Sequence, residues 1–118
     1  NVLRNQWQSY CILDLGVMNF SYSIIDLSIF IAHFCFDYIS QKPFFNLSLY
    51  NQTIETYSLY RNLSEAELAA IPILIQATYA IYLVAANYSL ENSNDYQSIA
   101  WVEFGKSGLR IPKSDLVL

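Results

Sequence analysis

Residues 63–90 read LSEAELAAIPILIQATYAIYLVAANYSL, and this stretch decides the fold class of the chain. Ser64 and Glu67 stand three residues apart, which is the spacing of a capping box, where each side chain bonds the backbone N–H of the other residue. Glu65 and Glu67 also place carboxylates at the positive end of the helix dipole. The sequence therefore predicts a helix that begins at Glu65.

The length of this helix follows from the residues after its first turn. No residue from 68 to 90 is charged. We expect the helix to run to about Tyr88, with a kink or a restart at Pro72 because proline cannot donate the helical hydrogen bond. A turn at 92–95 and a last helix over 96–104 should follow, and Gly105 and Gly108 should break the chain into a tail.

Upstream of this stretch, the pattern predicts a second buried helix. Apolar residues cover most of the circumference of a helix over 22–39, so several of its sides should be buried. The segment 40–53 contains Pro43 and many Asn and Ser residues and reads as a loop, and a short helix is expected over about 52–60.

The N-terminal residues have a pattern typical of strands and not of helices. Two short runs rich in β-branched and aromatic residues, 2–4 and 9–15, predict antiparallel strands, and Gly16 permits a sharp turn after the second. The predicted fold class is thus mainly α with a short β-hairpin. We expect one unit over 1–118, made of a hairpin over 1–16 and a helical part over 20–118.

Composition limits the classes of function. Of the 118 residues, 54% are apolar and 14% charged, which excludes a disordered tail. The net charge of −4 and the lack of a Lys/Arg cluster argue against a nucleic-acid partner. Cys11 and Cys35 belong to no CxxC motif, so we expect buried thiols in a reducing, cytoplasmic compartment.

A two-span membrane hairpin is an alternative interpretation. Residues 68–90 are long enough to cross a bilayer, and residues 15–36 carry only Asp26 as a formal charge. The alternative is disfavoured because a carboxylate near mid-membrane costs roughly 3 kcal/mol. The polar Gln76 and Asn87 within the second segment also suit a helix that packs among other helices.

One group of residues suggests chemistry. Asp14 follows a predicted buried strand and precedes Gly16, and Asn1 stands at the start of the preceding strand. In a hairpin these two side chains would meet at one end. Carboxylate and amide oxygens are ligands that Mg²⁺ accepts. Asp-Leu-Gly alone also fits an ordinary turn at the end of a strand, so the tripeptide leaves both interpretations open.

The order of the segments resembles a known family. The string ILDLGVMNFSYSIIDLSIFIAHF is similar to the segment after the catalytic loop of aminoglycoside/choline-kinase-like phosphotransferases. The later segments ETYSLYRNLSEAELAAIPILIQATYAIYLV and ENSNDYQSIAWVEFGKSGLRI resemble the hydroxylysine-kinase branch. The resemblance covers nearly the whole chain in order, and it implies the C-terminal lobe of a protein-kinase-like α+β fold.

The resemblance assigns roles to three residues. Asn1 matches the Asn that ends a His-x-Asp-x-x-x-x-Asn catalytic loop, and Asp14 matches the metal-binding Asp after the next strand. Both would hold Mg²⁺ and position a nucleoside triphosphate, ATP or GTP. Asp26 would have a structural role, capping or bracing the catalytic loop. Leu15 replaces a Phe, and Val17 stands where the family often has a second acidic residue.

By this resemblance the parent protein would transfer a phosphoryl group to a hydroxyl of a small amino acid or amine, as a hydroxylysine kinase does. The catalytic Asp should lie five residues before Asn1, and the N-terminal lobe is also missing, so we expect the fragment to be inert. Val17 keeps a pseudokinase open as an alternative.

Other polar residues receive weaker predictions. His33 is expected to be a packed, hydrogen-bonded core histidine. Asp37, Tyr38, Glu55 and Tyr57 lie where the helices of the family approach the acceptor, and an acidic group there would suit an amine.

Overall fold

The computed structural model describes residues 2–4, 10–12, 22–40, 42–93 and 95–116, and the side chains of 22–40, 42–93 and 95–116. Four α-helices make up most of the described chain: α1 (Ser23–Phe34), α2 (Leu47–Ser58), α3 (Glu65–Ser93) and α4 (Ser98–Gly108). A short 3₁₀ helix, η2 (Lys113–Leu116), closes the described part. The predicted mainly α class is confirmed.

The predicted hairpin is present in the described residues. Strand β1 (Val2–Arg4) pairs antiparallel with β2 (Tyr10–Ile12), in a register that joins Val2 to Ile12 and Arg4 to Tyr10. The sequence did not predict a second pair of strands, β3 (Phe36–Asp37) and β4 (Phe44–Phe45).

Helix α3 begins as predicted. The amide of Glu67 donates to the Ser64 hydroxyl at 3.3 Å, and the amide of Ser64 donates to Glu67 Oε2 at 2.9 Å. The helix continues through Pro72 without a restart and reaches Ser93 instead of Tyr88. Asn92 and Ser93, which were predicted to form a turn, instead bond the carbonyls four residues earlier, and these bonds satisfy their polar groups within the helix.

Helix α1 is shorter than predicted, and the expected helix to Ile39 is wrong. After Phe34 the chain enters β3, and the carbonyl of Cys35 accepts a hydrogen bond from the Asn46 amide at 2.7 Å. The strand pairing therefore takes the place of helical hydrogen bonds. Because β4 lies outside the segment 22–39, the apolar pattern of that segment gave no signal of this end.

Helix α2 begins earlier than the predicted 52–60, and the expected loop over 40–53 is wrong for its second half. Asn46 is the N-cap, and its side-chain oxygen accepts a hydrogen bond from the Leu49 amide at 3.0 Å. An Asn in this position satisfies one of the free amides at the helix start. The polar residues that suggested a loop lie on the exposed face of this helix.

Helix α4 spans Ser98–Gly108, so the predictions that it would end near Phe104 and that Gly105 would break it are wrong, whereas it does end at Gly108. A Cβ at Gly105 would stand 2.7 Å from Leu83 Cβ and 2.8 Å from the Tyr79 carbonyl oxygen. A Cβ at Gly108 would overlap the ring of Tyr79. The two glycines therefore let α4 approach α3 closely, and that contact outweighs their low helix propensity.

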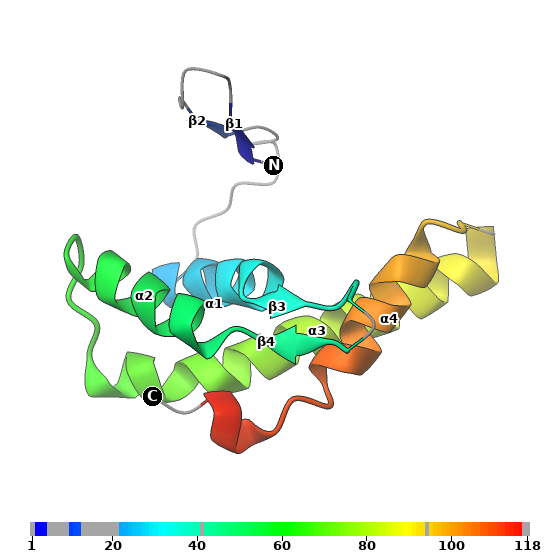
Figure 1. Cartoon of the computed structure of the whole chain (residues 1–118). Helices are drawn as coiled ribbons and strands as arrows, with labels where there is room; N and C mark the ends of the chain where they lie inside the picture. The colour runs from blue at the N-terminus through cyan, green and yellow to red at the C-terminus, as the bar shows by residue number, and fades with distance from the viewer. Residues whose placement is uncertain (1, 5–9, 13–21, 41, 94, 117–118) are drawn as a thin grey trace.

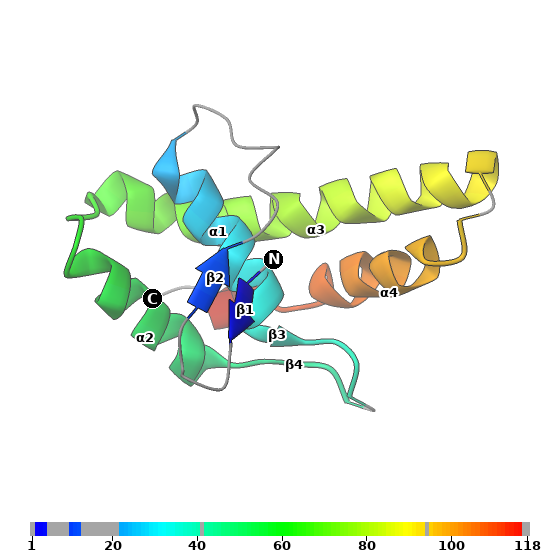
Figure 2. The same ribbon diagram turned by 90° about the horizontal axis from the view of Figure 1, so that it is seen from above.

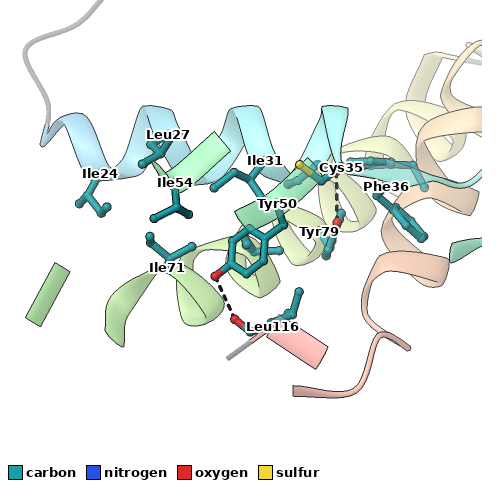
Figure 3. Close-up of a cluster of buried hydrophobic side chains, with 13 residues drawn as sticks. Ile24, Leu27, Ile31, Cys35, Phe36, Tyr50, Ile54, Ile71, Tyr79 and Leu116 are labelled. Carbon is teal, nitrogen blue, oxygen red and sulfur yellow. Dashed lines mark hydrogen bonds between the residues drawn. The ribbon is translucent and has the colours of Figure 1, made fainter. Parts of the chain in front are cut away.

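The helices are arranged around α3 (Figures 1 and 2). Helix α1 crosses α3, and α4 turns back along the C-terminal half of α3. The core lies where α1, α2 and α3 meet, and Figure 3 shows its side chains pointing toward one another. Its fully buried members include Ile31, Tyr50, Ile71, Ile75, Tyr79 and Leu116.

Two tyrosines tie this core together (Figure 3). The Tyr79 hydroxyl donates to the Ala32 carbonyl at 3.1 Å, which links α3 to α1. The Tyr50 hydroxyl donates to the Leu116 carbonyl at 3.0 Å, which links α2 to η2. Each bond satisfies a polar group that would otherwise be buried without a partner.

Candidate functional site

The predicted metal ligands, Asn1 and Asp14, lie outside the described residues, and so does Val17. The described strands flank them. Val2 pairs with Ile12, so the residue after Asn1 lies opposite a residue two positions before Asp14. Within the described ranges no three His, Cys, Asp or Glu side chains come together as a metal site would require. The predicted magnesium site stays a prediction.

Asp26 is placed by the structure in the first turn of α1, where its carboxylate is exposed and favours the positive end of the helix dipole. It does not cap the helix: Tyr22 is the N-cap residue, and the Tyr22 side chain makes no capping hydrogen bond. The alternative role, bracing a loop upstream of Asn1, concerns chain that the structure does not describe.

A cavity of about 740 Å³ lies between α1 and α2, with Asp26 on its wall. Residues 23, 26, 27 and 30 share one face of α1 because they are three or four positions apart. On α2, residues 49, 52, 53, 56, 57 and 60 follow the same spacing and extend into the turn after it. The lining is Ser23, Asp26, Leu27, Phe30, Leu49, Gln52, Thr53, Thr56, Tyr57 and Tyr60.

The chemistry of this cavity suits a small organic cation. Its volume is in the range of small-molecule sites. Asp26 is the only formally charged residue of its described lining, while Phe30, Tyr57 and Tyr60 offer aromatic surface. An ammonium group is attracted both by a carboxylate and by the face of an aromatic ring. Nearby, Arg61 is neutralised by its ion pair with Glu67.

The four residues predicted to approach an acceptor do not share one cavity. Tyr57 lines the cavity between α1 and α2, whereas Asp37 and Tyr38 line a separate hollow of about 400 Å³ beside His33. Glu55 is exposed and lines neither of the two. Sequence reasoning singled out Tyr57 and Asp26 but did not predict that they share a wall, because the packing of α1 beside α2 decides which helix faces meet.

Asp37 has a local structural role. Its carboxylate accepts hydrogen bonds from the amides of Ile39 and Ser40, at 3.1 and 3.0 Å, and from the Ser40 hydroxyl at 2.7 Å. The Ser40 bonds lower the pKa of the Asp37 carboxyl below its ordinary value. These bonds shape the turn after β3, in the manner expected of an Asp in a tight turn.

His33 is packed and hydrogen-bonded, as predicted, but it is half-buried beside the core instead of inside it. Its Nδ1 lies 2.8 Å from the Ile29 carbonyl oxygen, and its ring stacks on Phe104 with a centroid separation of 4.9 Å. Tyr82 and Trp101 approach the ring edge-on. The backbone bond and the aromatic contacts explain the histidine without a catalytic role.

Cys35 is a free thiol and fully buried, which confirms the prediction for this residue. Burial raises the pKa of the thiol, and a hydrogen bond with Thr53 opposes that effect. A protonated, buried thiol is a poor nucleophile. The side chain of Cys11 lies outside the described part of the structure.

The membrane alternative has one helix in its favour. Helix α3 is long and apolar enough to cross a bilayer, with a mean hydropathy of 1.9 over its most apolar window, but core helices of soluble proteins meet the same criterion. Helix α1, with 12 residues, would rise about 18 Å, which is short of the ~30 Å hydrocarbon core. The described α1 therefore cannot act as the first of two spans by itself.

Comparison with known proteins places the chain in no family. No family model, no curated protein and no solved structure matches it significantly.

Proposed function

We propose that the chain is the C-terminal, helical part of a cytoplasmic Mg²⁺-dependent kinase that phosphorylates a hydroxyl of a small amine or amino acid. The observation that carries the proposal is the register of the hairpin. Because Val2 pairs with Ile12, and consecutive Cα atoms are about 3.8 Å apart, the chain permits Asn1 and Asp14 to approach each other. The order of the described elements, a hairpin and then the partly buried helix α1, is the order expected for the family that the sequence resembles.

The donor chemistry fits the metal. One carboxylate and one amide oxygen are hard ligands, and Mg²⁺ is commonly held in kinases by such a pair together with the phosphates of the nucleotide. Asn1 and Asp14 would hold the ion, which would offset the negative charge of the triphosphate. Residues upstream of Asn1 would supply the base that accepts the proton of the acceptor hydroxyl.

The cavity between α1 and α2 supports an amine as the acceptor class. Asp26 would attract an ammonium group, and Phe30, Tyr57 and Tyr60 would surround its apolar stem. This assignment differs from a bracing role for Asp26, and kinetics of the parent protein separate the two. In Asp26→Asn, loss of ammonium binding raises the KM for an amine acceptor, whereas loss of a brace lowers kcat for every acceptor.

The proposal is tested on the protein that includes the residues before Asn1. We expect Asp14→Asn to lower phosphoryl transfer from ATP or GTP to 5-hydroxylysine by on the order of 1,000-fold, because metal and nucleotide would no longer be positioned. Asp115→Asn, an exposed aspartate in η2, is the matched control and should keep full activity.

Two results would contradict the proposal. Unchanged transfer in Asp14→Asn would remove the metal role of this residue. Nucleotide binding without turnover in the unaltered protein, for all small hydroxylated amines tried, would instead favour a pseudokinase.

A further inference from the structure

We draw no further inference here: the strongest candidate, the exposed apolar face of α3 formed by Ile73, Ala77, Ile81, Val84 and Tyr88, carries no proposal because nothing in the described part of the structure shows what covers it.

Discussion

The two faces of α3 are built from similar side chains but have opposite surroundings. On the inner face, Ile71, Ile75 and Tyr79 have no exposed surface, because they share one core cluster with side chains of α1, α2, α4 and η2. On the outer face, Ile73 and Ile81 are about two-thirds exposed. Composition and helix propensity do not distinguish these faces. Burial by neighbouring elements does, so stability should depend on the inner face much more than on the outer one.

The largest effect is expected where this comparison is most direct, at two isoleucines two residues apart. Ile75→Ala should lower the free energy of unfolding by about 3 kcal/mol, since it leaves a cavity in the core. Ile73→Ala, which is the matched control, should change it by less than about 0.5 kcal/mol because the side chain is already hydrated. Urea unfolding measures both.

Equal losses in the two variants would contradict the assignment of an inner and an outer face.

A smaller effect is expected at Gly108, which leaves room for the ring of Tyr79 because it has no side chain. In Gly108→Ala the new methyl group would overlap that ring, and Tyr79 is fully buried and bonded to Ala32. Overpacking costs about 1–3 kcal/mol, while alanine gains at most ~1 kcal/mol in helix propensity. We therefore expect a net loss of about 1–2 kcal/mol, measured by thermal unfolding.

Gly108→Ala in a Tyr79→Leu background is the control for this prediction. The smaller side chain removes the ring, so the alanine should then be neutral or stabilising. A protein stabilised by Gly108→Ala alone would show that α4 does not approach α3 through this glycine.

The smallest effect is expected at the start of α3, which both faces share. The Ser64 amide, the Arg61 guanidinium and the Ser64 hydroxyl all bond the Glu67 carboxylate, and they lower its pKa to about 2. The unfolded chain binds the proton near pH 4.5, so this carboxylate stabilises the fold above that pH. The contribution is lost as the pH falls from 4.5 to about 2.

Accordingly, Glu67→Gln should lower the melting temperature slightly at pH 7 and have no effect near pH 2. Glu65→Gln removes a charge from the same turn but no bond of the capping box, and should have a weaker effect. If the difference in melting temperature between Glu67→Gln and the unaltered chain were the same at pH 2 as at pH 7, the role of the ionised carboxylate would be contradicted.

The candidate site was only partly predictable from the sequence. Asn1 and Asp14 were singled out by residue type and by their places around a hairpin, and the described register of Val2 with Ile12 agrees with those places. The cavity between α1 and α2 was not predicted. Its wall combines Asp26 with Tyr57 and Tyr60, and only the packing of two helices brings these residues to one space.

By itself, the sequence determined the features whose causes are local. The capping box of Ser64 and Glu67 set the start of α3, and the short apolar runs set the strands of the hairpin. These patterns involve residues that are close together in the sequence, so they can be recognised without knowing which elements pack against each other.

The tertiary structure decided the features that depend on pairing or packing with another element of the chain. Helix α1 ends at Phe34 because β4 pairs with the residues that follow, and α4 retains Gly105 and Gly108 because α3 approaches there. The tertiary structure also determines which apolar face of α3 is buried. Two equally apolar faces cannot be told apart by hydropathy, since the difference lies only in which neighbouring helices remove them from water.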